Sequence, residues 1–523
     1  MTSESTDGRA AGIAAGYATE GQALELGTVV VDGVADPAAR VRIPLATVNR
    51  HGLVAGATGT GKTKSLQVLA EQLSAAGVPV LMADVKGDLS GLARPGEPGE
   101  KVSERAADTG DAWTPTAYPV EFLTLGTGGV GVPVRATVSS FGPILLSKVL
   151  GLNQTQESTL GLIFHWADQK GLPLLDLKDL RSVIHFLTSE EGKPELKALG
   201  AVSSTTAGVI LRTLINLEAE GADTFFGEPE FEPDDLLRLH ADGRGVVTLL
   251  ELGSQAARPV LFSTFLMWVL ADLFTTLPEV GDLDKPKLVF FFDEAHLLFA
   301  DASKAFLEQV EQTVKLIRSK GVGVFFCTQL PTDVPNGVLS QLGARVQHAL
   351  RAFTPDDEKA LRKTVRTYPK TDVYDLQSAL STLGIGEAIV TVLSEQGVPT
   401  PVAWTRMRAP RSLMDTIGAE AIAAAATASP LQAEYGRTVD RESAYERLAA
   451  RLAPPPAAPP ADLPPVPPPY DIPPMPAPAP EPGLFDKVMD SPAFKSAMRS
   501  AGTVIGREIT RSIFGTGRRR RRR

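Results

Sequence analysis

The stretch that most constrains the fold is GATGTGKT, residues 56–63. It matches the pattern GxxxxGK[ST], in which glycines let backbone N–H groups turn toward phosphate oxygens without a clash from a Cβ atom. The apolar run 52–55 before it suits a buried strand, and residues 65–75 after it carry apolar side chains at helical spacing. This order of strand, glycine-rich loop and helix predicts an α/β fold that places a phosphate at the N-terminus of the helix.

The whole loop is the predicted nucleotide-binding set, consisting of Gly56, Ala57, Thr58, Gly59, Thr60, Gly61, Lys62 and Thr63. Within it, Lys62 is expected to reach the β- and γ-phosphates, and the Thr63 hydroxyl to ligate Mg²⁺. The alternative is a glycine-rich turn between strand and helix that binds no ligand. The complete spacing and the flanking elements favour the nucleotide site.

A second part of the site is predicted where another strand ends. The apolar run 288–292 is typical of a central parallel strand, and Asp293 and Glu294 follow it directly. Ligands bind at this carboxyl edge of an α/β sheet. Asp293 is expected to hold Mg²⁺ through water, and Glu294 to polarise the water that attacks the γ-phosphate. The pair favours a hydrolysing motor over a kinase or a GTPase switch; the alternative is two solvated acids that cap the next helix.

Two further side chains are candidates for catalysis. Gln329 follows a strand predicted over 324–327, so it can touch the γ-phosphate or the attacking water. Arg318 lies in the last turn of a helix predicted over 302–320, where it can act as an arginine finger on the nucleotide of an adjacent subunit. It can equally be a cation that the helix dipole favours. The polar turn 84–88, at another strand end, can sense nucleotide or simply be solvated.

Composition indicates a soluble chain of several domains. Its 523 residues are 43% hydrophobic and 22% charged, and the single cysteine, Cys327, excludes a disulfide framework and fits a reducing cytoplasm. Residues 1–16 lack a basic region followed by an apolar core, so no signal peptide is indicated. The most apolar stretch, 260–277, is interrupted by Asp272 and bounded by prolines, and we interpret it as a buried crossover helix.

These patterns divide the chain into segments. We expect a disordered N-terminus (1–23), the first part of a P-loop core (24–140), an α-helical insertion (141–240), the second part of the core (241–410), a helical extension (411–452), a proline-rich linker (453–482) and a basic amphipathic helix with an arginine tail (483–523). Residues 24–48 predict two strands of an edge ribbon. The apolar loop 225–229 is expected to dock back on the core.

The C-terminus combines proline, apolar and basic patterns. Proline occupies 16 of the 30 positions in 453–482, which predicts a stiff extended linker. Beyond it, residues 494–513 carry an apolar helical face flanked by basic residues, and six arginines, 518–523, finish the chain. Such a tail can bind nucleic acid, an anionic membrane or an acidic partner. The net charge of −9 argues against a protein that coats DNA, but a motor needs basic residues only along its pore.

Taken together, the motifs resemble the bacterial HerA-like P-loop ATPases, within the wider HerA/FtsK group of ring-forming DNA translocases. The branch described as helicase HerA-like, C-terminal, is the most similar. The resemblance spans roughly residues 20–410 and the amphipathic C-terminus. It is carried by HGLVAGATGTGKT (51–63), DVKGDLSGLA (84–93), KPKLVFFFDEAHLLF (285–299), VKLIRSKGVGVFFCTQLPTDVP (314–335) and LGARVQHALRAFTPDDEKAL (342–361).

This resemblance implies a RecA-like core with strand order 5-1-4-3-2, ATP and Mg²⁺ in the phosphate loop, and Glu294 as the catalytic carboxylate. It supports Gln329 as a sensor and Arg318 as a finger acting on a neighbouring subunit, with Arg351 as a second arginine candidate. It also implies a homo-hexamer that translocates on DNA or unwinds it as a helicase. The chain departs from the family in one respect: only about fifty residues precede the phosphate loop, where HerA enzymes carry a sizeable β-barrel.

A second interpretation belongs to a different class of protein. The chain can be an ATP-dependent scaffold, or a membrane-associated assembly factor, whose ring binds protein and never moves along DNA. The sequence does not separate this interpretation from a motor, because pore loops carry no strict code.

Overall fold

The computed structural model describes residues 6–84, 87–126, 129–198, 203–251, 259–281, 283–300, 302 and 304–452. All of them belong to one compact unit, Met1–Ala453. The linker expected at 453–482, and the basic helix and arginine tail expected at 483–523, lie outside the described residues.

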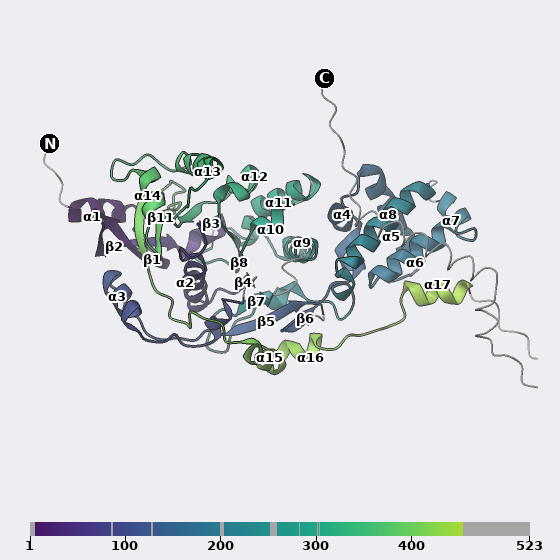
Figure 1. Cartoon of the computed structure of the whole chain (residues 1–523). Coiled ribbons are helices and arrows are strands. Elements are labelled where there is room, and N and C mark those ends of the chain that lie inside the picture. The colour runs from purple at the N-terminus through teal and green to yellow at the C-terminus, as the bar shows by residue number, and fades with distance from the viewer. Residues whose placement is uncertain are drawn as a thin grey trace, which may run out of the picture. The chain divides into compact units, whose positions relative to one another are not determined.

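One sheet organises the described part of the chain (Figure 1). Its strands are β1 (Ala23–Val31), β2 (Val34–Pro44), β3 (Gly52–Ala55), β4 (Val80–Asp84), β5 (Val120–Leu125), β6 (Val132–Val134), β7 (Val247–Glu251), β8 (Leu288–Phe292), β9 (Val322–Thr328), β10 (Ala344–Gln347), β11 (Glu387–Thr391) and β12 (Ala403–Met407). The twelve strands lie in the order β2-β1-β12-β11-β10-β3-β9-β8-β4-β7-β5-β6. Neighbours from β10 to β6 are parallel, and those from β2 to β10 are antiparallel.

The centre of the sheet has the topology of a RecA-like core. Numbered along the chain, strands β3, β4, β8, β9 and β10 lie in the order 5-1-4-3-2. The complete sheet differs from this minimal order, because β7, β5 and β6 extend it beyond β4 and four antiparallel strands extend it beyond β10. The edge ribbon predicted from residues 24–48 is the pair of β1 and β2.

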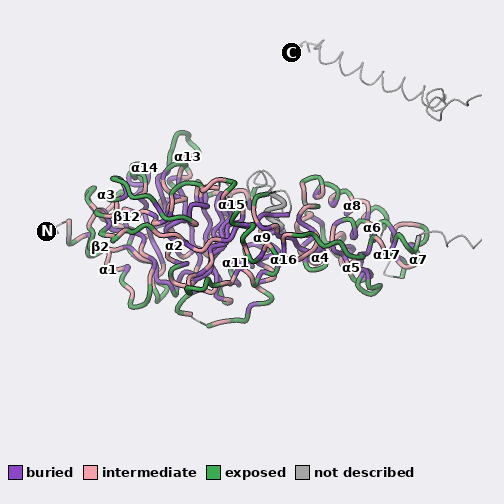
Figure 2. Tube along the Cα trace, turned by 90° about the horizontal axis from the view of Figure 1, so that it is seen from below, coloured by how far each residue is buried: buried purple, intermediate pink, exposed green. Residues whose placement is uncertain are grey.

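Apolar side chains fill both faces of the sheet. Alternate residues of β8 divide between two clusters, because successive side chains of a strand point to opposite faces. Phe290 and Phe292 belong to one cluster, and Val289 and Phe291 to the other. Figure 2 shows the buried residues gathered in the interior and the exposed residues around it. The continuous apolar run of β8 is therefore the pattern that a strand covered on both faces requires.

Seventeen α-helices are described, and several of them cover these two faces. They are α1 (Thr6–Ala15), α2 (Lys62–Ala75), α3 (Glu100–Asp108), α4 (Val138–Val149), α5 (Gln154–Gln169), α6 (Leu177–Thr188), α7 (Lys193–Ala198), α8 (Ser204–Ala219), α9 (Pro259–Thr276), α10 (His296–Phe299), α11 (Lys304–Ile317), α12 (Asn336–Leu339), α13 (Pro355–Val365), α14 (Leu376–Thr382), α15 (Ala419–Ala428), α16 (Pro430–Tyr435) and α17 (Ala444–Leu452). Helix α2 packs on one face, and α9 and α11 pack on the other. None of the helices in the described ranges has the length and apolar character that crossing a bilayer needs.

The expectation of a disordered N-terminus over residues 1–23 is wrong from residue 6 onward. Helix α1 begins at Thr6, and Ala10, Ile13 and Tyr17 are buried. The Tyr17 hydroxyl lies 2.8 Å from the carbonyl oxygen of Val390 and 2.6 Å from that of Pro401. The sequence pattern hides this order, because α1 has few apolar residues: the helix packs on β1 and β2, and the Tyr17 hydroxyl after it reaches residues nearly 400 positions further along the chain.

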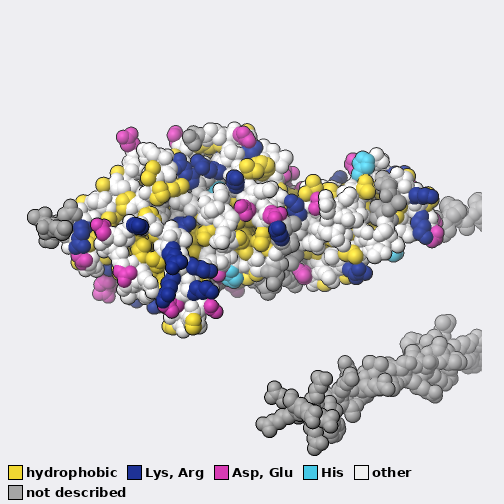
Figure 3. All heavy atoms as spheres, turned by 90° about the horizontal axis from the view of Figure 1, so that it is seen from above, with side chains coloured by type: hydrophobic (Ala, Val, Ile, Leu, Met, Phe, Trp, Pro, Cys, Tyr) yellow, Lys and Arg dark blue, Asp and Glu magenta, His cyan; other side chains and the backbone are white. Residues whose placement is uncertain are grey.

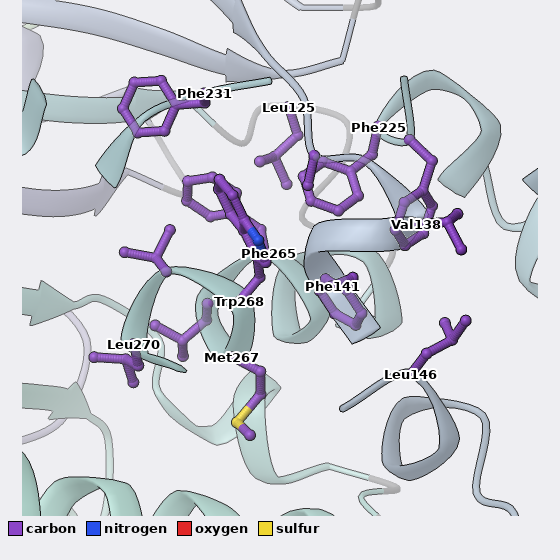
Figure 4. Packing of buried hydrophobic residues seen from close by; sticks show 14 of the residues in the cluster. Leu125, Val138, Phe141, Leu146, Phe225, Phe231, Phe265, Met267, Trp268 and Leu270 are labelled. Carbon is purple, nitrogen blue, oxygen red and sulfur yellow. The ribbon is translucent and has the colours of Figure 1, made fainter. Parts of the chain in front are cut away.

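Helices α4 to α8, called the helical group below, occupy the chain between β6 and β7. They join the core through aromatic rings that Figure 4 shows at close range. Phe225 is fully buried, and its ring lies 5.0 Å from that of Phe226 and 6.1 Å from that of Phe265 in α9, both in edge-to-face geometry. Phe226 in turn lies 5.5 Å from Phe141 in α4. The loop 225–229 therefore packs back on the core, as its apolar residues predicted.

After β12, residues 408–452 form a C-terminal arm. In Figure 1 its helices α15 and α16 lie beside β5 and β6, and α17 lies beside α6. The buried Arg135 donates from Nη1 to the carbonyl oxygen of Tyr435 at 3.0 Å. Further along, the N–H of Ala444 donates to the carbonyl oxygen of Pro173 at 3.0 Å. The arm thus contacts both the sheet and the helical group.

Candidate functional site

The phosphate loop connects β3 to α2. Gly56, Gly59 and Gly61 have φ angles of 153°, 78° and 112°, a range that other residues rarely adopt. Helix α2 begins at Lys62, directly after Gly61, which has no side chain to cap the first N–H groups of the helix. These N–H groups and the positive end of the helix dipole favour an anion at this point.

The Lys62 side chain folds onto the loop. Its Nζ donates to the carbonyl oxygen of Ala57 at 3.2 Å, and the side chain is largely buried. The Thr60 hydroxyl donates to the same carbonyl oxygen at 2.7 Å. The ammonium group is therefore held within the loop, where phosphate oxygens would replace the carbonyl as its partners.

A fully buried histidine, His348, packs against the phosphate loop and the first turn of α2. Nδ1 of His348 lies 2.8 Å from the carbonyl oxygen of Glu387, and Nε2 lies 2.9 Å from the Ser65 hydroxyl oxygen in α2. Since a carbonyl only accepts, Nδ1 carries the proton and Nε2 accepts from Ser65. Burial lowers the pKa of His348 to about 4, so the ring is neutral near pH 7. A Cβ atom on Gly56 would lie 2.5 Å from that of His348, so no bulkier residue than glycine fits there.

No sequence pattern indicated His348 or a second support of the loop, Gly386. The N–H of Gly386 donates to the carbonyl oxygen of Thr60 at 3.0 Å, and a Cβ atom on Gly61 would lie 3.2 Å from the Gly386 Cα atom. The one available signal for His348 was a polar residue directly after an apolar strand. That position could not be linked to the loop without the pairing of β10 with β3.

Asp293 and Glu294 lie at the same edge of the sheet as the loop, because β3, β9 and β8 are adjacent and parallel. Only 5% and 6% of their surfaces are exposed. Asp293 Oδ1 accepts the N–H of Glu294 at 2.9 Å, and Nδ1 of His296 lies 3.4 Å from Glu294 Oε2. Glu294 has φ of 47°, in the left-handed region that costs a non-glycine residue about 1–3 kcal/mol and is found mostly at functional sites.

A third carboxylate, Asp84, ends the neighbouring strand β4. It is buried, and its two oxygens accept the N–H groups of Gly87 at 2.7 Å and Leu89 at 2.9 Å. Burial raises the pKa of Asp84 to about 6, and the charge of Asp293 adds to this effect. Asp84 therefore organises the turn that follows it and is shielded from solvent; residues 85 and 86 of that turn lie outside the described residues.

The oxygen donors at this edge suit Mg²⁺. Thr63 offers a hydroxyl and Asp293 a carboxylate, the hard oxygen ligands that this cation prefers. A cation would also relieve the repulsion from Asp293, which adds to the effect of burial on the pKa of Asp84. In the part of the chain that the structure describes, no group of three or more His, Cys, Asp or Glu could hold a metal by itself. A metal ion here would therefore need further ligands from nucleotide and water.

Gln329 lies between the loop and the carboxylates. It follows β9, the strand between β3 and β8, and its side chain is exposed. The N–H of Gly56 donates to the carbonyl oxygen of Thr328 at 3.2 Å, which places Gln329 directly beside the loop. Asp333 holds this turn, since its Oδ2 accepts from the Thr328 hydroxyl at 2.6 Å.

The two candidate arginines lie at opposite edges of the sheet. Arg318 is exposed between α11 and the start of β9, near His51, whose pKa burial lowers to about 4 with a contribution from the charge of Arg318. It is therefore not brought together with the loop of its own chain. Arg351 is exposed at the carboxyl edge, two residues after Ala349, whose carbonyl oxygen accepts the N–H of Ala57 at 2.8 Å.

This fold and loop define a P-loop NTPase of the RecA-like type. The chain belongs to the family described as Helicase HerA-like C-terminal, whose model matches residues 31–522. A search of curated proteins found no relative.

Solved structures that match this chain include a bacterial conjugative coupling protein and VirB4. The bacterial conjugative coupling protein TrwB without its first 70 residues, in complex with sulphate, is 15% identical with a TM-score of 0.50, over 78% of this chain and 94% of that one. TrwB with the ATP analogue ADPNP is 16% identical with a TM-score of 0.49, over 78% and 95% of the two chains. VirB4 of Thermoanaerobacter pseudethanolicus is 16% identical with a TM-score of 0.45, over 75% and 98%. The similarity to the TrwB structure with sulphate supports a shared fold and nothing beyond it.

Proposed function

We propose that this protein binds ATP with Mg²⁺, hydrolyses it, and uses the reaction to move along or unwind DNA as a ring. The observation that carries the ATPase assignment is the placement of the phosphate loop and of the buried Asp293 and Glu294 at one edge of the sheet. One strand separates them, and Gln329 extends from that strand. Membership of the HerA-like family supports the same assignment.

Each candidate residue has one task in this proposal. The backbone N–H groups of the loop and the Lys62 ammonium bind the β- and γ-phosphates. Thr63 and Asp293 hold Mg²⁺, which neutralises charge on the phosphates. Glu294 accepts a proton from water as the water oxygen attacks the γ-phosphorus, and the bond from the γ-phosphorus to the bridging oxygen of ADP breaks. Gln329 orients that water.

The position of Arg318 supports a ring. A side chain at the amino edge of the sheet is remote from the loop of its own chain, but it can reach the loop of a neighbour that presents its carboxyl edge. An arginine from the next subunit would stabilise the negative charge that develops on the γ-phosphate. We therefore propose a homo-oligomer, with six subunits as the family resemblance implies.

The proposal that the motor moves on DNA is supported by the family and by surface charge. The chain is acidic overall, yet Figure 3 shows lysine and arginine side chains gathered in groups on the face seen from above. Contacts with phosphates need only a few such groups in each subunit, and they weaken steeply as salt rises.

The decisive experiment measures the ATPase rate at low salt without nucleic acid, with double-stranded DNA and with single-stranded DNA. Heparin serves as a polyanion control, and the Lys62→Ala variant gives the background. We expect DNA, and not heparin, to raise the rate, with the increase lost as salt rises. Hydrolysis that is equal with and without DNA would favour the scaffold, and a rate no higher than that of Lys62→Ala would exclude ATPase activity.

A further inference from the structure

The strand order fixes the direction in which a nucleotide lies, provided that the proposed ATP site is correct. The carboxylates Asp293 and Glu294 follow β8, which lies on one side of β3 with β9 between them. Since these carboxylates act on the γ-phosphate, the phosphate chain points from the loop toward β8. The nucleoside must therefore extend to the other side of β3, over β10 and β11.

Two segments on that side are bonded to the phosphate loop. The segment after β10 is joined through Ala349, whose carbonyl oxygen accepts the N–H of Ala57 at 2.8 Å. The segment before β11 is joined through Gly386, whose N–H donates to the carbonyl oxygen of Thr60 at 3.0 Å. Both segments therefore form the rim of the site where a nucleoside would leave the loop.

This rim carries the two most exposed large apolar side chains of the described ranges. Phe353 is 87% exposed and Ile385 is 74% exposed. Such exposure to water is costly for a phenyl ring and for a sec-butyl group, and burial against a ligand would recover that free energy. Neither side chain has a role in the core of the chain.

The backbones that carry these side chains are fixed. The N–H of Phe353 donates to Asp357 Oδ2 at 3.1 Å, within the capping box that starts α13. The carbonyl oxygen of Ile385 accepts from Arg105 Nη2 at 2.9 Å. An aromatic ring on a rigid support loses little conformational entropy when a ligand stacks on it.

We propose that Phe353 and Ile385 form the contact for the base of the bound nucleotide. The base is a flat aromatic ring, and stacking on a phenyl ring suits it because every base has a π-face. Ile385 covers the base or its sugar from the other segment of the rim. Neither side chain touches the phosphates, so the contact adds affinity for nucleoside triphosphates without changing affinity for their phosphate chain.

The test compares ATP with inorganic tripolyphosphate, each with Mg²⁺, by isothermal titration calorimetry on the full chain. The variants are Phe353→Ala, Ile385→Ala and Phe353→Trp. Val398→Ala is the matched control, since Val398 is 61% exposed but lies in the turn between β11 and β12, at the opposite edge of the sheet.

We expect Phe353→Ala to weaken ATP binding about tenfold, Ile385→Ala to weaken it less, and Phe353→Trp to keep it, with tripolyphosphate bound equally by all variants. Unchanged ATP affinity in Phe353→Ala, or an equal loss for ATP and tripolyphosphate, would overturn the base contact. If the parental chain binds neither compound, the proposed ATP site itself fails, which is a distinguishable result.

Discussion

Glu294 is placed by its backbone as much as by its side chain. Its φ of 47° lies in the left-handed region, and the side chain is buried next to the end of β8. This position suits a group that must hold water in one orientation. We therefore expect that a substitution of Glu294 slows the hydrolysis of ATP without weakening its binding.

We predict that Glu294→Gln binds ATP as the parental chain does but hydrolyses it about 10²–10⁴-fold more slowly, because the amide cannot accept the proton of water. Lys62→Ala is expected to lose binding itself, since the charge that faces the β- and γ-phosphates is gone. Binding by calorimetry and turnover by phosphate release report the two steps separately. Parental turnover in Glu294→Gln would remove the general-base assignment.

The buried His348 makes stability depend on pH. Its folded pKa of about 4 lies below the ordinary value of 6.5, so between these values the unfolded chain takes up a proton that the folded chain refuses. Stability is therefore lost as pH falls from 6.5 to 4, by about 3 kcal/mol in total for a shift of this size.

We predict that this loss is absent from His348→Gln, which stays neutral at every pH. Urea unfolding of both chains over a pH series should show the free energy of unfolding of the parental chain falling relative to that of the variant below about pH 6.5. Asp84 affects the pH dependence in the opposite direction, but it is present in both chains. Its contribution therefore cancels when the free energies of unfolding of the two chains are subtracted. Curves that run parallel would mean that His348 is protonated in the folded state.

At the scale of elements, α11 decides what Arg318 can reach. Val310, Val314 and Ile317 are buried on the sheet, so the helix is fixed and its end presents Arg318 to solvent at the amino edge of β9. The loop after β10 presents Arg351 at the other edge. In the proposed ring, we therefore expect Arg318 to act on a neighbouring subunit and Arg351 on its own.

We predict that Arg318→Ala lowers ATP hydrolysis about 10³-fold or more, and that mixing it with Lys62→Ala subunits restores part of the rate. One subunit then supplies an intact loop and the other an intact finger. Lys315→Ala, an exposed cation one turn earlier in α11, is the matched control and should keep its activity. Full activity of Arg318→Ala, or of an isolated monomer, would exclude the trans mechanism.

The same mixing experiment separates the arginines. If Arg351 acts within its own chain, no subunit in a mixture of Arg351→Ala and Lys62→Ala has a complete site, and the rate stays low. Restoration by that mixture would instead assign Arg351 to the neighbouring subunit.

At the scale of the whole described unit, the C-terminal arm ties the helical group to the sheet. Tyr435 is fully buried, its ring lies 5.3 Å from that of Phe231, and its hydroxyl donates to Asp235 Oδ2 at 2.7 Å. Further along the arm, the N–H of Tyr445 donates to Asp179 Oδ1 at 2.8 Å, while its ring is 41% exposed beneath the Lys178 ammonium.

We predict that Tyr435→Ala lowers the free energy of unfolding by about 3–5 kcal/mol, the range for removing a large buried ring. Tyr445→Ala in the same arm should cost about 1 kcal/mol or less, because it loses an exposed cation–π contact and keeps its backbone hydrogen bond. Thermal unfolding followed by circular dichroism measures both. Equal losses of unfolding free energy in the two variants would mean that the buried Tyr435 ring stabilises the contact of the arm no more than the exposed Tyr445 ring does.

The local part of this architecture could be predicted from the sequence. The phosphate loop, the start of α2, and β8 with Asp293 and Glu294 at its end follow from short patterns whose geometry depends on neighbouring residues. The edge ribbon, the buried crossover helix α9 and the docking of the loop 225–229 follow from apolar content in the same way. The family resemblance added the central strand order, which short patterns do not contain.

The tertiary structure alone decided which remote segments meet. His348 and Gly386 support a loop that lies hundreds of residues earlier in the chain, and the Tyr17 hydroxyl lies against residues near the end of the core. The opposite placement of Arg318 and Arg351 likewise depends on the strand ends at which they lie. A sequence pattern reports the period of one element, but contact between elements depends on how the strands pair. That pairing is settled by burial across the whole sheet, and no single stretch of sequence encodes it.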